Sequence, residues 1–207
     1  GERQKFTPAQ NMAMNLGKVL RLNDDGSVPE DNPFYGQGNV TEQIWTLGHR
    51  NPLGIDFDEK GNLWAHEMGP RHGDELNIIE RGRNYGYPAV SQGDHYSGVK
   101  IPNHEDYPIF KSPELAWVPA ISPAGFIIYK GDKFSDWKGN GFIGGLSSKA
   151  LVRVAFNKDD EGNWKVEEVE RYEWGKRVRE VEQDSKGNIY VLEDKEGGRL
   201  IKLNSLN

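Results

Sequence analysis

Short apolar stretches, separated by turn residues, run along the whole of this chain. They are rich in β-branched and aromatic side chains, and no window keeps a helical period over about 11 residues or more. The pattern predicts strands, so the chain is expected to be all-β. The predicted strands cover residues 18–22, 43–46, 55–57, 62–65, 125–129, 150–154, 188–192 and 199–203.

Two segments of the sequence repeat each other. Residues 58–67 and 184–193 share the pattern D-x-K-G-N-[L/I]-[W/Y]-x-x-E and begin 126 residues apart. Each is expected to form a strand, a tight turn with glycine in the left-handed conformation, and a second strand. Propeller blades take about 40–45 residues, so the spacing corresponds to about three blades. A β-propeller explains this repeat better than a β-sandwich, and 207 residues make fewer than five blades of that size.

Composition narrows the classes of function. The chain has no cysteine, which excludes disulfides, thiolate metal sites and cysteine nucleophiles. The net charge of −6, without any basic cluster, argues against a nucleic-acid partner. No apolar run approaches the roughly 18–20 residues that span a bilayer, and the polar first residues contain no signal peptide. Residues 93–123 show little strand character, so they are expected to form a loop over one face.

Candidate chemistry is densest between residues 64 and 88. Glu67, Asp74 and Glu75 are oxygen donors among glycines, a combination that suits Ca²⁺, and the alternative is a solvated turn. His66 and His72 lie six residues apart, unlike the H-E-x-x-H zinc motif. The remaining histidines are interpreted as hydrogen-bonded or surface residues: His49, His95 and His104.

Three arginines are candidates for binding an anion. Arg50, followed by Asn51, comes directly after a predicted strand and offers a planar set of donors. Strand alternation places Arg177 and Arg179 on one face, which is costly on an inward face unless an anion lies between them. The alternative is a solvated cationic strand face. The sequence contains no nucleophile elbow, phosphate-binding loop or dinucleotide fingerprint.

Four motifs, in order and at matching spacing, resemble those of a known enzyme family. The family is that of the glucose/sorbosone dehydrogenases, and the similarity to its soluble quinoprotein aldose sugar dehydrogenases runs over nearly the whole chain. The resemblance implies a six-bladed β-propeller, with residues 1–207 forming a partial propeller of about four to five blades from its C-terminal portion. The motifs occupy residues 16–34, 47–54, 67–77 and 83–88.

The family resemblance also implies an activity. Its members use pyrroloquinoline quinone (PQQ) and Ca²⁺ to oxidise the C1 hydroxyl of aldose sugars to lactones, by hydride transfer to the quinone. The substrate is then an aldose, the electrons pass to an external acceptor, and the location is periplasmic or secreted.

Site residues carry over from the family by position. Arg50 is implied as the catalytic residue that polarises the quinone, with Asn51 beside it, and Arg177 and Arg179 bind the cofactor carboxylates. The carbonyls of Gly69 and Pro70 are implied ligands of the PQQ-bound Ca²⁺, and Glu75 and Tyr85 of a second, structural Ca²⁺. A basic residue of the family falls at Ser147 here, with Lys149 two positions on, and on a regular strand both point to the same face.

The family's general base is a histidine upstream of a motif that corresponds to Gly1-Glu2-Arg3. None of the five histidines corresponds to it. The chain alone is therefore expected to have little or no dehydrogenase activity, and the missing N-terminal blades are an expected partner. Two other functions stay open: a non-catalytic propeller used as a binding scaffold, and a calcium-dependent hydrolase of the lactonase type. A scaffold has no use for the arginines and Asn51, and a lactonase needs several inward carboxylates around one metal.

Overall fold

The computed structural model describes residues 8–204, and the regular structure within them consists of thirteen strands and four single-turn 3₁₀ helices. The all-β prediction is confirmed, while the predicted Gly1-Glu2-Arg3 motif lies outside the described residues. The elements are η1 (Pro8–Gln10), β1 (Lys18–Leu20), η2 (Thr41–Gln43), β2 (Ile44–Leu47), β3 (Pro52–Phe57), β4 (Leu63–Glu67), β5 (Asp74–Ile78), η3 (His104–Asp106), β6 (Leu115–Trp117), β7 (Pro123–Ile128), η4 (Ser135–Trp137), β8 (Gly141–Gly145), β9 (Ala150–Lys158), β10 (Trp164–Glu173), β11 (Val178–Gln183), β12 (Ile189–Glu193) and β13 (Leu200–Lys202).

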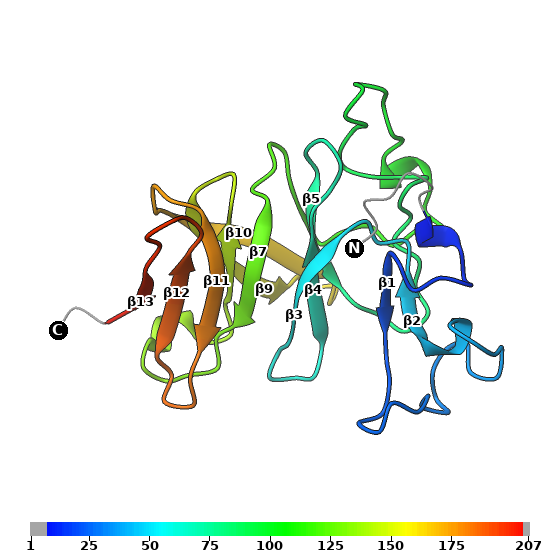
Figure 1. Ribbon diagram of the computed structural model, residues 1–207, viewed down its shortest axis with the longest axis horizontal. Coiled ribbons are helices and arrows are strands. Elements are labelled where there is room, and N and C mark those ends of the chain that lie inside the picture. The colour runs from blue at the N-terminus through cyan, green and yellow to red at the C-terminus, as the bar shows by residue number, and fades with distance from the viewer. Residues whose placement is uncertain (1–7, 205–207) are drawn as a thin grey trace. The chain divides into compact units, whose positions relative to one another are not determined.

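The chain divides into two compact units. The first comprises residues 1–52 and 67–118, and the second residues 53–66 and 119–207. In the first unit, β1 pairs with β2 and β5 with β6, both antiparallel. In the second unit, β3 neighbours β4, the strands β10-β9-β8-β7 form one sheet and β11-β12-β13 another (Figure 1). Strands that follow each other in sequence are neighbours in these sheets, and most are joined by short connections. Longer segments join β1 to β2 and β5 to β6.

The core of the second unit lies between its two larger sheets, where β11 packs against β7 and β8. Every second residue of β12 is buried, as expected for a strand with one face in the core. None of the helices within residues 8–204 has the length and apolar character needed to cross a membrane. The buried cluster consists of Ile127, Tyr129, Phe142, Leu151, Val178, Val181, Ile189 and Val191.

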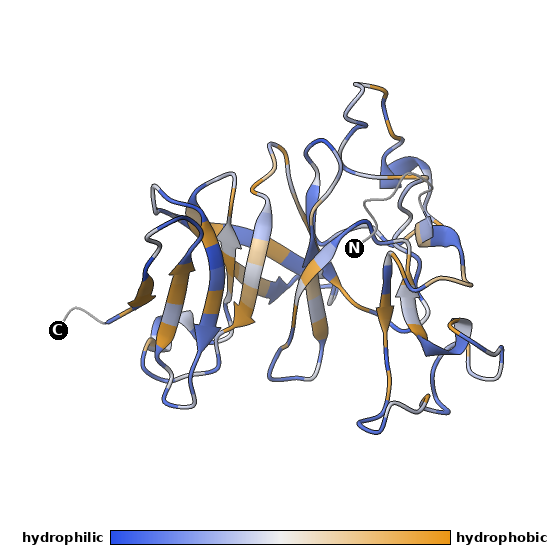
Figure 2. Ribbon diagram, in the orientation of Figure 1, coloured by the Kyte–Doolittle hydropathy of each residue, from blue (hydrophilic) through white to orange (hydrophobic). Residues whose placement is uncertain are grey.

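The turn predicted from the internal repeat is confirmed at both copies. Between β3 and β4, Asp58 Oδ1 accepts the backbone N–H groups of Lys60 and Asn62 at 2.9 Å each, and Oδ2 accepts Asn62 Nδ2 at 2.7 Å. Asp184, between β11 and β12, accepts the corresponding bonds at the same distances. A third copy at Asp159 joins β9 to β10. Figure 2 shows these turns as hydrophilic, between strands with apolar positions.

The strand β5 was not among the predicted strands. All five of its residues are buried, Asp74 and Glu75 included, so the solvated-turn alternative for these two carboxylates is wrong. A strand buried on both faces is expected to be a continuous apolar run, and the polar residues of this strand interrupt such a run. The predicted loop at residues 93–123 is largely irregular, as expected, but it also contains η3 and β6.

Gly61 gives a test of the repeated turn. Its φ is +82°, and a Cβ there would meet no atom within 4 Å, so a substitution changes the backbone preference alone. We expect Gly61→Ala to lower the free energy of unfolding by about 1 kcal/mol, measured by urea denaturation. Gly61→Asn is the matched control and should cost less, because asparagine enters the left-handed region more readily. Equal stability of Gly61→Ala and the parent chain would contradict the assigned turn.

Candidate functional site

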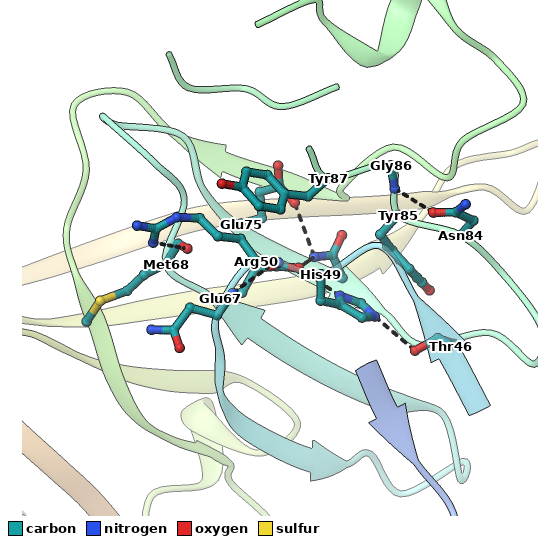
Figure 3. Close-up of polar contacts among 12 residues, drawn as sticks. Thr46, His49, Arg50, Glu67, Met68, Glu75, Asn84, Tyr85, Gly86 and Tyr87 are labelled. Atoms are coloured by element: carbon teal, nitrogen blue, oxygen red, sulfur yellow. Dashed lines mark hydrogen bonds and ion pairs between the residues drawn. The ribbon is translucent and has the colours of Figure 1, made fainter. Parts of the chain in front are cut away.

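The carboxylate of Glu67, at the end of β4, contacts four nitrogen atoms although the side chain is buried (Figure 3). Its Oε2 accepts the backbone N–H of Arg50 at 2.5 Å and that of Asn51 at 3.4 Å. Its Oε1 lies 2.8 Å from His49 Nδ1 and 3.2 Å from Asn77 Nδ2. Two nitrogen contacts on each oxygen compensate for the lost hydration of this charge. We call these five residues the Glu67 cluster.

His49 is held in the Glu67 cluster by contacts on both ring nitrogens and on its ring face. Its Nε2 lies 2.9 Å from Thr46 Oγ1, and its ring stacks on Tyr85 with 4.4 Å between centroids. Thr46 and His49 are both buried. The prediction of His49 as a hydrogen-bonded structural residue is confirmed.

The turn that carries this cluster depends on Gly48. Its φ is +79°, and a Cβ would lie 2.2 Å from Asn84 Oδ1 and 2.5 Å from Gly86 N. The backbones meet there: Tyr85 N–H donates to Leu47 O at 2.8 Å. Only glycine allows this approach without strain. The two motifs at residues 47–54 and 83–88, separate in sequence, are therefore in contact.

Arg50 is buried, and no counter-charge lies beside it within the described part of the chain. The residue is 5% exposed, and its Nη1 donates to the Met68 carbonyl at 2.8 Å (Figure 3). The ring of Tyr96 lies 6.0 Å from the guanidinium carbon. Among residues 8–204, no carboxylate lies within ion-pair distance of this guanidinium. A buried cation of this kind is costly unless an anion or several acceptors compensate it.

Glu75 lies beside the Glu67 cluster on β5 and is also buried. Asn77 Nδ2 lies 3.5 Å from its Oε2. Burial, and then the charge of Glu67, raise the pKa of the Glu75 carboxyl well above its usual range. The Oδ1 of Asn77 is buried and has no hydrogen-bond partner among the described residues. Two carboxylates and an unpaired amide oxygen thus lie together, an arrangement that a cation would stabilise.

Gly69 and Pro70 are buried, and their carbonyl oxygens accept no hydrogen bond from any described residue. Buried carbonyls are nearly always paired, so these two are available to a ligand. The Gly69 N–H is bound by Asp74 Oδ1 at 3.0 Å, which fixes the start of the turn. Within the described residues, no group of three or more His, Cys, Asp or Glu side chains could hold a metal ion.

Tyr85 is fixed at both ends. Its hydroxyl donates to the Ile78 carbonyl and accepts the Glu80 N–H at 3.1 Å. Burial raises the pKa of the Tyr85 phenol. Its backbone carbonyl lies 3.0 Å from His104 Nε2, and burial lowers the pKa of His104, which favours the neutral ring. His104, also predicted to be a hydrogen-bonded histidine, therefore ties the 93–123 segment to Tyr85.

In the second unit, Arg177 and Arg179 share one partner. Arg177 Nε and Arg179 Nη2 each lie 2.8 Å from Asp194 Oδ2. The predicted common face is confirmed, and the anion between the two arginines is a carboxylate of this chain. Both side chains are exposed, as in the solvated alternative, and do not lie on a buried inward face. Their hydrogen bonds, Arg177 first, hold the pKa of Asp194 below its usual range. Each guanidinium keeps further N–H donors for a second anion.

Glu193, the counterpart of Glu67 in the repeat, is buried among cationic side chains. Arg199 Nη2 donates to its Oε1 at 2.6 Å, and Lys176 Nζ lies 3.4 Å from Oε2. Trp174 Nε1 donates at 3.2 Å. These hydrogen bonds, that of Arg199 above all, lower the pKa of Glu193 to about 2. The repeat therefore places a buried carboxylate at the same position twice, with different partners.

The expectation that Ser147 and Lys149 share a strand face is wrong. Both lie in the turn between β8 and β9, and Lys149 has a φ of +53°. Ser147 Oγ donates to the Ala120 carbonyl at 3.1 Å. The strand β8 ends at Gly145, one residue before the last apolar residue, Leu146. The polar residues that follow form the turn to β9.

Sequence reasoning assigned no role to Asn77 or Asp194 and noted Glu67 only as an oxygen donor. The repeat was a usable signal for Glu67, because both copies end in glutamate. No such signal marked Asn77 or Asp194, whose contacts depend on which strands lie together.

Comparison with known proteins places these contacts in context. A family model described as Glucose / Sorbosone dehydrogenase matches residues 1–202. Aldose sugar dehydrogenase YliI of Escherichia coli (strain K12) is 37% identical over 212 residues, covering 100% of this chain and 56% of the relative. The chain spans about half the length of the curated relatives it matches.

Solved structures agree with this match. The chain superimposes on a crystal structure of a glucose dehydrogenase with a TM-score of 0.89 and 39% identity, covering 100% of this chain and 60% of that one. On the PQQ-bound aldose sugar dehydrogenase of Streptomyces coelicolor the TM-score is 0.67 and the identity 26%, covering 95% of this chain and 54% of that one.

Glu193 predicts a specific acid sensitivity. Its pKa in the folded chain, about 2, lies below the ordinary value of 4.5, so its ionised form stabilises the fold. This contribution is complete above pH 4.5 and is lost as the pH falls from there to about 2. We expect Glu193→Gln to be less stable at neutral pH and to lose less stability over that acid range. The measurement is the urea midpoint against pH, with exposed Glu196→Gln as control, and parallel curves for Glu193→Gln and the parent would contradict the assignment.

Proposed function

The chain belongs to the glucose/sorbosone dehydrogenase family, and on that premise we propose that it forms the cofactor-binding part of a PQQ-dependent aldose sugar dehydrogenase. The reaction is oxidation of the C1 hydroxyl of an aldose to a lactone, with electrons passed to an external acceptor. The PQQ-bound relative supports the cofactor. Since the chain spans about half of its relatives, the complete activity is proposed for a protein that also contains their remaining length.

The observation that carries this proposal is the state of Arg50. Its guanidinium is buried and has no carboxylate partner among the described residues. A surface arginine would be solvated, and a structural buried arginine would have an acidic partner. An arginine with neither fits a site where negative charge develops on a bound oxygen. Bound PQQ supplies the quinone that accepts the hydride.

This chain's residues do the binding and the electrostatic work. Arg50 stabilises negative charge on the bound oxygen, and Asn51, adjacent in the same turn, offers an amide to the same ligand. The burial of Arg50 excludes water and lowers the local dielectric, which strengthens its interaction with an anion.

In the second unit, we assign Arg177 and Arg179 to the cofactor carboxylates. Both guanidinium groups donate to the same oxygen of Asp194. This supports the assignment, because each guanidinium keeps further N–H donors for a second anion. Ser147 and Lys149 are proposed as further cofactor contacts from the turn between β8 and β9.

The oxygen donors near the Glu67 cluster fit Ca²⁺. The unpaired carbonyls of Gly69 and Pro70 would bind the ion that accompanies the cofactor. The Glu75 carboxylate and the Tyr85 carbonyl would bind a second, structural ion. All four are hard oxygen ligands, and the buried Glu75 gains most from a cation, since burial otherwise disfavours its charge.

For the fold we propose a partial six-bladed β-propeller, with residues 1–207 as one domain of about four to five blades. The antiparallel sheets of sequence neighbours and the TM-score of 0.89 support it. The remaining blades of such a ring would come from the length that the relatives have and this chain lacks. A periplasmic or secreted location is proposed by family resemblance.

PQQ titration in the presence of CaCl₂, followed by visible absorbance, tests the proposed function. We expect saturable binding, and a dissociation constant raised about 10–100-fold by Arg50→Ala, because a hydrogen-bonded charge contributes about 1.5–3 kcal/mol. Arg83→Ala is the matched control: this exposed arginine lies in the same unit.

The same titration, with an assay of lactone hydrolysis beside it, separates the alternatives. Absence of PQQ binding by the parent chain would favour the scaffold, and lactone hydrolysis without quinone would favour the hydrolase. Equal binding by Arg50→Ala and Arg83→Ala would remove Arg50 from the site.

Thermal unfolding tests the proposed calcium ligands. A ligand that binds the folded state at 100 times its dissociation constant adds about 2.7 kcal/mol of stability, so CaCl₂ should raise the Tm of the parent chain and EDTA should reverse the shift. Glu75→Gln should lose most of the shift, whereas the partly exposed Glu80→Gln should keep it. An undiminished shift in Glu75→Gln would exclude Glu75 as a ligand.

A further inference from the structure

Glu67 touches the backbone of Arg50 but not its guanidinium. Its Oε2 accepts the Arg50 N–H at 2.5 Å and lies 3.4 Å from the Asn51 N. The only ion-pair partner of Glu67 among the described side chains is His49. The carboxylate therefore acts on the path of the chain through residues 49–51 rather than on the charge of the arginine.

The next residue, Met68, contacts the same turn from its backbone. Met68 N–H donates to Asn51 O at 3.1 Å, and Met68 O accepts Arg50 Nη1 at 2.8 Å. Residues 67 and 68 thus bind Arg50 at its amide and at its guanidinium. With two separate anchors, the long side chain loses rotamer freedom in advance of any ligand.

Neighbouring buried groups fix the Glu67 carboxylate itself. His49 lies 2.8 Å from its Oε1 and is in turn 2.9 Å from Thr46 Oγ1. Asn77 Nδ2 lies 3.2 Å from the same oxygen. In a low-dielectric interior such a connected network is stiff, because breaking any bond leaves a buried polar group unpaired.

The counterpart Glu193 in the second copy of the repeat has a different set of partners. Glu193 binds the side chains of Arg199, Lys176 and Trp174, and its Oε2 also accepts the Arg199 N–H at 3.2 Å. Glu67 has no arginine or lysine side chain as a partner among the described residues, and its Oε2 accepts two consecutive backbone N–H groups. The carboxylate at this motif position therefore binds mainly charged side chains in one copy and mainly a turn of the backbone in the other.

We propose that Glu67 is a positioning residue that fixes the turn of Arg50 and Asn51 and so presents the Arg50 guanidinium to an anionic ligand oxygen. The inference rests on the proposed function, because the ligand is the quinone cofactor. The chemistry assigned to Glu67 is hydrogen bonding alone, with no proton or electron transferred.

A double-mutant cycle read by PQQ titration with CaCl₂ tests this proposal. We expect Glu67→Ala to raise the dissociation constant about tenfold or more, and Glu67→Gln, which keeps an oxygen for the Arg50 N–H, to raise it less. In an Arg50→Ala background, Glu67→Ala should cause a smaller further loss, because Glu67 can then act only through Asn51. Glu114→Gln, a mostly buried carboxylate elsewhere in the first unit, is the control.

Amide hydrogen exchange supplies a readout that needs no cofactor. Exchange at the Arg50 and Asn51 amides should be faster in Glu67→Gln than in the parent and unchanged in Glu114→Gln. The Gln variant keeps the test available if Glu67→Ala does not fold. Unchanged exchange, unchanged PQQ affinity, or an equal loss in the Arg50→Ala background would each overturn the inference. No PQQ binding by the parent chain would instead overturn the proposed function, and with it the functional part of this inference.

Discussion

A charge removed from water needs an opposite charge or a full set of hydrogen bonds. In both units of the chain this requirement determines which residues surround a buried glutamate. Glu193 meets it with cationic side chains and Glu67 with backbone amides, histidine and asparagine. Both carboxylates end a strand that follows the same aspartate-centred turn. The repeat therefore fixes a buried acid at a strand end, and the surrounding elements determine what that acid does.

Two buried charges in the first unit do not meet the requirement within the described residues. Arg50 has a carbonyl and a distant ring as neighbours, and Glu75 has one long contact with Asn77 and another carboxylate nearby. Structural charges are rarely left in this state, because the desolvation cost is several kcal/mol per ion. An anion beside Arg50 and a cation beside Glu75 would compensate both. The proposed quinone, with its carboxylates, and the proposed calcium ion carry charges of the signs that would do so.

The sequence predicted correctly those structural features that depend on residues close together in the chain. The turns at Asp58 and Asp184 follow from the repeat. In each turn the aspartate accepts the backbone N–H groups of the residues two and four positions later, and these bonds depend only on the local sequence. The strand at Asp74–Ile78 was not predicted because three of its five buried residues are polar, so it lacks the apolar run that marks a strand buried on both faces. Ser147 and Lys149 were placed on a strand from the family resemblance, yet β8 ends at Gly145 and the chain turns there.

Local patterns alone establish that this chain is all-β, where its tight turns lie and which motifs it shares with a dehydrogenase family. These depend on side chains a few residues apart, whose geometry is the same in any fold. Three contacts depend on which segments distant in sequence pack together. Glu67 binds the Arg50 N–H, and Asn77 contacts both Glu67 and Glu75. Asp194 binds both Arg177 and Arg179. Burial is a property of everything that surrounds a residue, so the charges that lose their water cannot be identified from the residues themselves.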